Sequence, residues 1–519
     1  TVTLYAFDDN GKLVYQKTEE GDVLGHTRSI IDPMYDAGIR LLHVGINSAC
    51  PLPSVPTFCR WRSPSGNDLL LVYQKDYGED EVLPDGKTVV SINFTGDNHG
   101  PHSYERVKKI YADLRKRYPQ AQLVGASFND VARELLLIKK DLPVVTSEIG
   151  DTWIFGYGGA PIRMAKFRAV SRLYSQWLNE GKIKKDSDVA LDFAAELGLI
   201  AEHTQGVDVK THLRQWDKYD MDKFLKGRSE GIFSMAEASW KEIDNYIDSA
   251  IAFLPASLQK EAREVVAEVD KVKLEDNSKM KPMERKRWEQ PIAGGMTLAG
   301  LSYQMFDGDD YDDFQNRYLR ARYGWALDDL GKRGLKESHA VSVTLYAQTM
   351  AQSVRKEKKG TRIITELRFP ENEKVDKRVY PERIQVNCFT TKNGKRSEVA
   401  LTIYGKPAVR LPESYWLSFT VPGIESVIAE KMGERVDLMD VVEKGNRQMH
   451  GIDRYVDLIT SGETIRISSK EAFLLNVGEA QGLNYSTNYP DKRKGAHFNL
   501  NNNLWGTNFS MWNEGSLTY

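Results

Sequence analysis

The chain has 519 residues, with 71 lysines and arginines against 73 aspartates and glutamates, so its formal net charge is −2. This near-balance argues against a nucleic-acid sleeve or a membrane-surface protein, because both bind through a basic excess. A hydrophobic fraction of 41% can fill a large core, and at ~150 residues per domain the length suggests two to four domains. Three cysteines, Cys50, Cys59 and Cys388, are too few and too scattered for a disulfide framework or a cysteine-based zinc site.

The ends of the chain and its hydropathy say little about location. No apolar run reaches the ~18 residues that a membrane span requires, so we expect a soluble chain without a transmembrane segment. The chain opens on Thr1, with no Met and no signal-like apolar region, and we expect a processed, truncated or engineered start. The sequence does not indicate a compartment.

The first zone, residues 1–158, alternates short apolar runs with amphipathic stretches. Helices are predicted at Ser103–Tyr118 and Asn129–Lys140, each with one apolar face. Strands spaced by helices predict a parallel sheet, open or closed into a barrel, with functional loops at the carboxyl ends of its strands. The predicted strands are Thr1–Phe7, Leu41–Ile46, Leu69–Tyr73, Val89–Phe94 and Leu123–Ala126.

Two further zones differ in their periodicity. Residues 159–275 show a 3.6-residue period throughout and predict a helical bundle. Residues 276–519 are mostly short alternating runs separated by Gly, Pro, Asn and Asp, apart from a helical stretch at Tyr311–Tyr323, and they predict a β-sandwich. Within this last zone we expect Asn499–Asn503 to be a turn and Asn503–Phe509 to be a strand that closes the sandwich. The predicted bundle helices are Pro161–Glu180, Ser187–His203, Gly231–Phe253 and Ser257–Val272.

Two polar segments in the first zone could carry chemistry. Asp22 lies just before Gly25 and a predicted helix, where a carboxylate can act as a nucleophile or a metal ligand near positive backbone N–H groups. It can equally be a helix-entry turn residue. Asp97 lies in a Gly-rich loop after the strand Val89–Phe94 and could act as a general acid if its pKa is raised. A surface turn is the alternative for this loop.

Two later segments combine carboxylates with aromatic or imidazole side chains. Glu148, Asp151 and Trp153 suit sugar binding, because carboxylates accept hydroxyl hydrogens and an indole face covers the apolar face of a pyranose. The alternative is a domain junction with Trp153 in the core. Glu202 and His203 end a predicted helix, where His203 is either a metal ligand or a cap that neutralises the helix dipole.

Taken in order, these segments resemble glycoside hydrolase family 38, the α-mannosidase superfamily. More closely they resemble a branch of it that carries a domain of unknown function (DUF5054-type). The resemblance runs from about Gly21 to the C-terminus and implies a family-38 α/β barrel, a helical bundle and a β-sandwich of galactose-mutarotase type. The zones predicted above agree with that layout. The resemblance is densest in Asp22–Thr27, Leu42–Asn47, Gly96–Pro101, Glu148–Trp153, Glu202–Leu213 and Asn503–Phe509.

Members of this family are retaining glycoside hydrolases that use zinc and two carboxylates. The family's Asp-Pro-Phe-Gly-His-Ser segment falls on Asp22–Thr27, which implies that Asp22 is both the nucleophile and a zinc ligand. The family's late zinc-binding histidine falls on His203. Asp97 is the implied general acid/base, on a looser match. The implied pocket-lining residues are Glu148, Asp151, Trp153 and Glu202.

The N-terminal segment Thr1–Glu20 departs from the family pattern. The family has two more zinc ligands in a His-x-Asp segment upstream of the nucleophile, and here no histidine precedes Asp22. The resemblance therefore implies an incomplete zinc site in a barrel that lacks its first part, either in a fragment or in a degenerate member. Because such a sheet exposes edges, we expect a chain that is less stable than a full-length relative, or one that needs a partner, as an oligomer or with a complementing chain.

Two functions remain open at this point. The first is a retaining, zinc-dependent glycoside hydrolase acting on α-mannoside-like carbohydrates. The second is a non-catalytic carbohydrate-binding pseudo-enzyme or an inactive fragment, suggested by the absent ligand segment together with aromatics such as Trp153, Trp216, Trp505 and Trp512. A metal-dependent polysaccharide deacetylase is less well supported, because the chain has no His-x-x-x-His.

Overall fold

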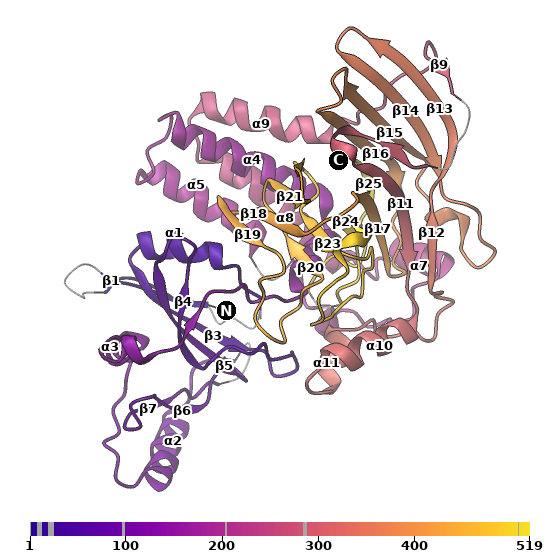
Figure 1. The fold of residues 1–519 in the computed structure, drawn as a ribbon. Helices are drawn as coiled ribbons and strands as arrows, with labels where there is room; N and C mark the ends of the chain where they lie inside the picture. Colours follow the sequence, from indigo (N-terminus) through magenta and orange to yellow (C-terminus); the bar gives the residue numbers. More distant parts are fainter. Residues whose placement is uncertain are drawn as a thin grey trace.

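The computed structural model describes residues 25–95, 99–202, 205–283, 288–506 and 508–519 in full, and residues 2–7 and 13–18 by their backbone. An N-terminal sheet with its helices, a layer of long helices and a large β region follow one another along the chain (Figure 1). The protein is thus a mixed α/β and β-sandwich arrangement with several antiparallel sheets. No helix in the described ranges is both long and apolar enough to cross a membrane.

The N-terminal sheet has mixed strand directions. Among the described strands its order is β2-β1-β3-β5-β4-β8, and β3 pairs with β5, and β4 with β8, in parallel. The other three pairings are antiparallel. The strands are β1 (Val2–Phe7), β2 (Leu13–Thr18), β3 (Ile39–Ile46), β4 (Phe58–Arg62), β5 (Asp68–Lys75) and β8 (Val144–Val145), and β6 (Asp80–Val82) forms a separate hairpin with β7 (Val89–Ser91).

Two predictions for this zone are wrong, for local reasons. The sheet is not wholly parallel, because β4 and β5 are joined by the tight turn Ser63–Asn67, and a connection this short permits only an antiparallel pair. The apolar run Leu123–Ala126 is not a strand, and its Val124 is 70% exposed. The helices of the zone are η1 (Arg28–Ile30), α1 (Ile31–Asp36), α2 (Tyr104–Arg117), α3 (Phe128–Leu137) and η2 (Lys139–Asp141).

The helical layer agrees with the predicted bundle. Its long helices pack around a core of their own that includes Val170, Trp177, Phe193 and Ile247. The Oγ atom of Ser187 caps the second of these helices by accepting from the N–H of Ala190. The helices are α4 (Pro161–Asn179), α5 (Asp188–Gly198), η4 (Leu199–Ala201), α6 (Val209–His212), α7 (Met221–Ser229), α8 (Ser234–Ala252) and α9 (Ala256–Asp270).

Among the described residues, the β region contains two large antiparallel sheets and a smaller one. One large sheet has the order β10-β11-β17-β24-β23-β20, with β12 beside β11, and the other has the order β25-β16-β15-β14-β13-β9. The smaller sheet is β19-β18-β21-β22. On β11 (Thr297–Met305), Leu301 and Tyr303 alternate with Ser302 and Gln304, which is the period expected of a strand.

The remaining elements of the β region have the following bounds. The strands are β9 (Lys281–Pro282), β10 (Gln290–Pro291), β12 (Val343–Tyr346), β13 (Gln348–Glu357), β14 (Gly360–Arg368), β15 (Arg383–Thr391), β16 (Ser397–Lys406), β17 (Glu413–Thr420), β18 (Ser426–Lys431), β19 (Glu434–Asp437), β20 (Met449–Gly451), β21 (Tyr455–Ile459), β22 (Thr464–Ser468), β23 (Leu474–Val477), β24 (Ala496–Asn502) and β25 (Gly515–Thr518). The helices are η5 (Ala293–Gly295), α10 (Gly308–Tyr318), α11 (Gly324–Asp329), η6 (Lys377–Val379) and η7 (Lys492–Lys494).

The asparagine-rich segment is not the turn that we expected. Residues 499–502 belong to β24, in the middle of its sheet, and their side chains are buried. Asn502 donates to the carbonyl of Phe155 at 2.9 Å. Asn503, just after the strand, donates to the carbonyls of Val409, Leu411 and Met511. These amides are buried because they satisfy backbone groups that would otherwise be unpaired.

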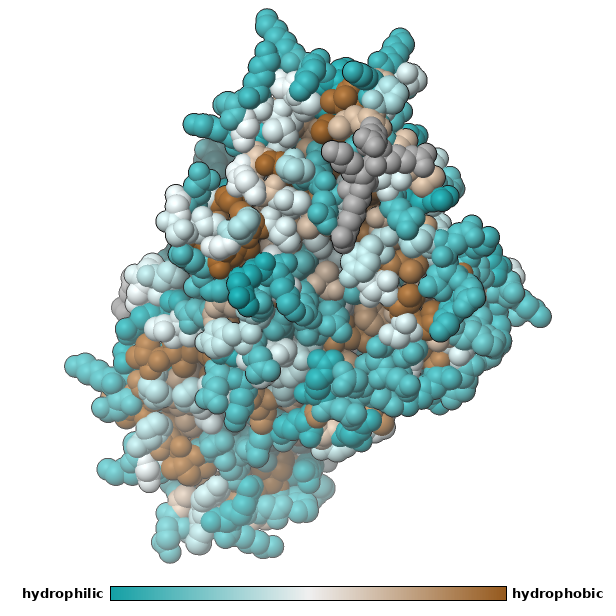
Figure 2. Space-filling view, turned by 45° about the vertical axis from the view of Figure 1, so that its right-hand side comes forward, coloured by the Kyte–Doolittle hydropathy of each residue, from teal (hydrophilic) through white to brown (hydrophobic). Residues whose placement is uncertain are grey.

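One hydrophobic core joins the N-terminal sheet to the β region. It contains Trp61 and Tyr73 from the sheet, Trp153 from the following 3-10 helix η3 (Trp153–Gly159), and Tyr318 and Trp505 from the β region. On the face shown in Figure 2, the hydrophobic side chains lie in small groups among hydrophilic ones.

Candidate functional site

A pocket of about 440 Å³ lies where the three regions meet. Its size falls in the ~300–1,000 Å³ range of small-molecule sites. The first zone contributes Gly25–Thr27 and residues between 148 and 157, α4 contributes Arg168, and the β region contributes the rest. The lining residues from the β region are Lys431, Met432, Val441, Met449, His450, Gly451, Ile452, Asp453, Phe473 and Phe509.

The segment around Glu148 connects the two walls of the pocket through its backbone. On one side, His26 and Ile149 exchange N–H···O hydrogen bonds of 2.7 and 3.1 Å. On the other side, Glu148 donates to the carbonyl of Asp440 and accepts from the N–H of Val442, each at 2.9 Å. The segment therefore pairs like a short strand with partners from both ends of the chain.

The carboxylate of Glu148 is buried and fully engaged. Its Oε1 atom accepts from the backbone N–H of Arg28 at 2.7 Å and from the hydroxyl of Thr27 at 3.1 Å. Its Oε2 atom accepts from Nζ of Lys431 at 2.7 Å. The side chains of Glu148 and Lys431 are only 5% and 13% exposed, so this ion pair is poorly screened by solvent. Glu148 thus fastens the first zone to β18.

Asp151 is a different kind of carboxylate. It is buried, and its Oδ atoms accept from the hydroxyl of Tyr318 and from the N–H of Trp153, each at 3.0 Å. Burial raises its pKa to about 6, and these hydrogen bonds offset only part of the desolvation. Among the described residues no cation bonds to this carboxylate. Asp151 therefore changes charge near neutral pH while lining the pocket.

Two glycines, Gly25 and Gly150, allow the backbone segments around the pocket to pack closely against each other. A Cβ atom on Gly25 would lie 2.8 Å from the Cβ of Asp151, and one on Gly150 would lie 2.2 Å from the carbonyl oxygen of Asn446. No larger residue fits at Gly150 without moving the backbone of the β region. The Gly-Asp sequence at 150–151 is thus a packing requirement as well as a source of a carboxylate.

The β-region wall carries further polar groups. The Nε2 atom of His450 lies 3.0 Å from the carbonyl of Arg447, and burial lowers the pKa of His450 to about 3, so the ring is neutral. Arg168 donates to the carbonyls of Asp453 and Lys470, and burial lowers its pKa to about 10. Burial raises the pKa of Asp453, which also lines the pocket.

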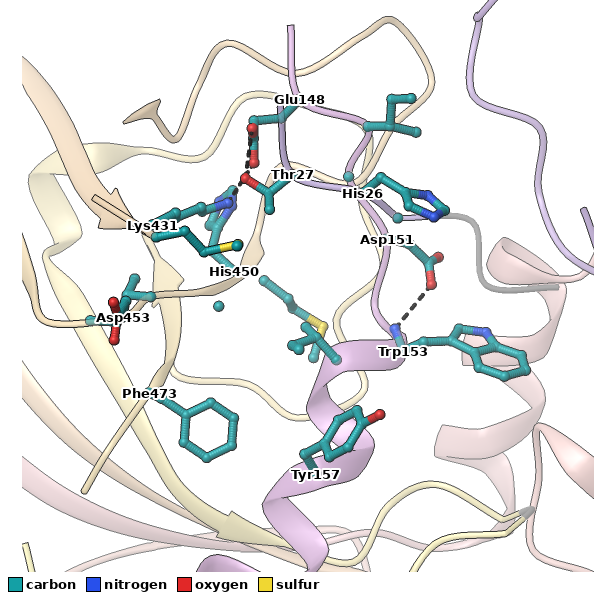
Figure 3. Close-up of a pocket in the computed structure, with 18 of the residues that line it drawn as sticks. His26, Thr27, Glu148, Asp151, Trp153, Tyr157, Lys431, His450, Asp453 and Phe473 are labelled. Atoms are coloured by element: carbon teal, nitrogen blue, oxygen red, sulfur yellow. Dashed lines mark hydrogen bonds and ion pairs between the residues drawn. The ribbon is translucent and has the colours of Figure 1, made fainter. Parts of the chain in front are cut away.

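Aromatic side chains lie at the other end of the pocket. Figure 3 shows Tyr157 and Phe473 there, away from the polar group formed by Glu148, Thr27 and Lys431. The pocket thus has an aromatic end and a hydrogen-bonding end. That division suits a ligand with an apolar face and several hydroxyl groups.

The predicted site residues fall into three groups. Glu148, Asp151 and Trp153 line the pocket together, although Trp153 is only 6% exposed and its ring centroid lies 5.8 Å from that of Trp505. Glu202 does not line it. The pKa of Tyr157, a lining residue, is raised to about 12 by burial and by the nearby charge of Glu202. Asp22, Asp97 and His203 lie outside the described residues.

The described residues next to Asp22 and His203 lie at or near the pocket, and those next to Asp97 do not. Gly25–Thr27, shortly after Asp22, line it. Beyond His203, the N–H of Gln205 donates to the carbonyl of Asn508 at 2.7 Å, next to the lining residue Phe509. The described residues on either side of Asp97 do not line the pocket, and Phe94 stacks on Tyr77 at the carboxyl end of β5. Strand β8 runs antiparallel to β5. The segment that leads from β8 to Glu148 therefore leaves the sheet at the opposite end of the strands from the carboxyl end of β5.

Sequence reasoning missed the β-region half of the pocket. Lys431, His450, Asp453 and Phe473 lie in or beside short strands that carry no motif, and Arg168 lies within a helix that looked purely structural. The one signal that could have pointed to Arg168 is its position among apolar residues of an amphipathic helix. A buried cation in such a position needs a partner.

Zinc was implied by the resemblance and needs at least three protein ligands. Within the described ranges, no group of three or more His, Cys, Asp or Glu side chains is arranged to hold a metal ion. The described residues alone therefore do not fit a zinc site. The predicted ligands, Asp22 and His203, are not among them, and zinc stays a prediction.

The fold and the pocket define a mixed α/β and β-sandwich protein with a small-molecule-sized cavity between its regions. Residues 158–289 contain a domain described as a domain of unknown function (DUF5054). This span covers the helical layer and agrees with the branch that the sequence resembles. No curated protein matches the chain.

Proposed function

We propose that this protein is a retaining glycoside hydrolase that binds an α-mannoside-like sugar in the pocket between its three regions. The observation that carries the proposal is convergence. Segments that resemble the family at Gly25–Thr27, Glu148–Trp153 and Phe509 lie far apart in the sequence and line one cavity.

The lining suits a sugar for chemical reasons. Asp151 and His450 offer hydrogen-bond acceptors and donors to ligand hydroxyls, and Tyr157 and Phe473 offer apolar surface to a pyranose ring. Asp22 is the proposed nucleophile, from the resemblance. For the general acid/base, two carboxylates compete: Asp97, from the resemblance, and Asp151, which lines the pocket and has a pKa of about 6. A pKa near the working pH favours general acid–base catalysis.

The test is hydrolysis of aryl α-mannosides by the purified chain, with and without a metal chelator. We expect turnover that the chelator abolishes, and a product of retained configuration by NMR. Asp22→Asn should reduce kcat by at least ~10³-fold while leaving the fold intact. Asp36→Asn, which changes an exposed carboxylate on α1, is the matched control and should leave kcat unchanged. No turnover of any aryl glycoside would contradict the proposal.

A second pair of variants identifies the acid/base. If Asp151 has this role, Asp151→Asn should lower kcat by about 10²–10⁴-fold and remove the basic limb of the pH profile, and Asp97→Asn should have little effect. The opposite result would assign the role to Asp97.

A non-catalytic sugar-binding protein is the second candidate. It is favoured by the state of two lining carboxylates: both oxygens of Glu148 and both oxygens of Asp151 already accept hydrogen bonds from protein donors, so neither carboxylate is free to attack a substrate. Calorimetry with mannose and mannosides separates the two functions. Binding without turnover and without stoichiometric zinc would favour this candidate.

A further inference from the structure

A second, much smaller cavity lies between α6, α11, the segment around Trp216 and Tyr219, and loops of the β region. Its volume is about 20 Å³. A cavity needs about 10–15 Å³ to hold one water-sized particle, so this one has room for a single small occupant. Its lining residues are Val209, Trp216, Tyr219, Asp328, Gly331, Lys332, Arg333, Arg410, Gly506 and Met511.

Two of the lining residues are cations in the protein interior. Arg410 is 2% exposed, and its guanidinium lies 4.1 Å from the ring centroid of Tyr219 and 5.2 Å from that of Phe233. Its Nη1 atom donates to the carbonyl of Trp216 at 3.2 Å. Lys332 is partly buried as a residue, and its Nζ atom donates to the carbonyl of Trp505 at 3.0 Å. Both cations therefore bond to neutral groups.

The acidic side chains nearby are already engaged. Asp328 pairs with Arg333 at 3.4 Å, and Asp217 pairs with Lys218 at 3.3 Å. Among the residues that the structure describes, no carboxylate bonds to Lys332 or Arg410. The carbonyl end of the short helix α11 precedes Lys332 and offers partial negative charge only. The cavity wall therefore carries Lys332, Arg333 and Arg410 against the single carboxylate of Asp328.

Buried charges in proteins are normally paired, because an isolated ion in the interior costs several kcal/mol. Burial and the charge of Arg410 lower the pKa of Lys332 to about 7, and burial also lowers the pKa of Arg410. The fold thus holds a desolvated arginine, and a desolvated lysine that is about half protonated at neutral pH, against one cavity. A negatively charged occupant of the cavity would offset the cost of burying both side chains without a carboxylate partner.

We propose that this cavity binds one small monatomic anion, of the size of chloride, between Lys332 and Arg410. The volume excludes sulfate and phosphate. The site joins Trp216 and Tyr219 to Arg410 of the β region, so the bound anion stabilises the contact between these segments. The proposal is independent of the proposed hydrolase activity, because no residue of the large pocket takes part.

The test is thermal unfolding of the full chain in sodium chloride and in sodium gluconate at equal ionic strength and pH 7. Gluconate is too large for the cavity, so only chloride should bind. We expect a Tm about 2 °C higher in 150 mM chloride, because a ligand that binds only the folded state shifts the unfolding equilibrium. Equal Tm values in the two salts would overturn the proposal and indicate water in the cavity.

The variant Lys332→Met tests whether the chloride-dependent rise in Tm comes from this cavity. It removes one of the two cations, and we expect the difference between chloride and gluconate to disappear. Lys226→Met, on the exposed surface of α7, is the matched control and should keep the full difference. A Lys332→Met chain that retains the chloride effect would also overturn the proposal. The wild-type comparison stands without any variant, so a variant that fails to fold does not remove the test.

Discussion

Two regions of the molecule each contain a buried lysine–glutamate pair. One pair lies within the core of the β region, and the other links two regions beside the pocket. In the sandwich, Nζ of Lys406 lies 2.5 Å from Oε1 of Glu413, with side chains 5% and 0% exposed. At the pocket, Lys431 and Glu148 lie 2.7 Å apart and are somewhat more exposed. The first pair joins residues close in the sequence, whereas the second joins residues 283 positions apart.

The neighbours of the two pairs explain the difference. Glu413 also accepts from the hydroxyl of Tyr303 at 2.7 Å, and Lys406 also donates to the carbonyls of Pro407 and Asn513. That pair is enclosed by protein and stabilises the sandwich core. The pair at the pocket holds two regions together beside a cavity. Buried ion pairs can therefore serve the core in one region and the geometry of a site in another.

The largest expected effect is that of Lys406→Met. It leaves the carboxylate of Glu413 buried without its cation, which destabilises a fold by about 3–5 kcal/mol. The measurement is the free energy of unfolding from urea denaturation. A loss below about 1 kcal/mol would show that Glu413 becomes protonated at little cost, and would remove the contrast between the two regions.

The next effect concerns pH and Asp151. Its pKa is about 6 in the folded chain and close to 3.8 in the unfolded chain, so between these values the folded state holds a proton that the unfolded state releases. The resulting stabilisation is complete below about pH 4, is lost as the pH rises to about 6, and amounts to at most about 3 kcal/mol. Asp151→Asn should flatten this part of the stability profile, measured by urea denaturation from pH 4 to 7. The exposed Asp36→Asn should leave the profile unchanged.

A smaller effect is expected for Lys431→Met. The carboxylate of Glu148 keeps its hydrogen bonds to Thr27 and the N–H of Arg28 and lies closer to solvent than Glu413, so we expect a loss of about 1–3 kcal/mol. A double-mutant cycle with Glu148→Gln isolates the coupling between the two side chains. A loss equal to that of Lys406→Met would mean that position beside a cavity makes no difference.

The smallest effect is expected for a pair on the surface. Nζ of Lys336 pairs with Asp312, and the two side chains are 57% and 43% exposed. Lys336→Met should change the free energy of unfolding by less than about 1 kcal/mol, because exposed pairs are screened by solvent. The losses in the free energy of unfolding measured for Lys406→Met and Lys431→Met are compared with the loss for this variant.

The sequence predicted elements where one local signal dominated. The helices α4, α8 and α9 were found within a few residues because their apolar positions recur at helical spacing. Strand β13 carries little strand signal of its own, because most of its side chains are at least partly exposed and it contains Arg355 and Lys356. The run Leu123–Ala126 was misread because an apolar run can also lie on the surface, as Val124 does.

The site divided in the same way. Glu148, Asp151 and Trp153 were predicted from one segment in which carboxylates and an indole stand close together in the sequence, and they line one pocket. Lys431 and His450 could not be predicted from the sequence. Their place in the pocket depends on the pairing between Glu148 and Val441, and that contact has no local sequence pattern. The asparagines of β24 were misread as a turn because their partners are distant carbonyls.

The position of β24 in its sheet also bears on how this chain folds during synthesis. The strand lies between β17 and β23, yet its residues 496–502 are synthesised after both of them. Until the ribosome has released this segment, the flanking strands present two open edges where a foreign strand can add. The β region therefore depends on β24 to close this sheet, and a chain that lacks residues 496–502 should aggregate through the open edges of β17 and β23.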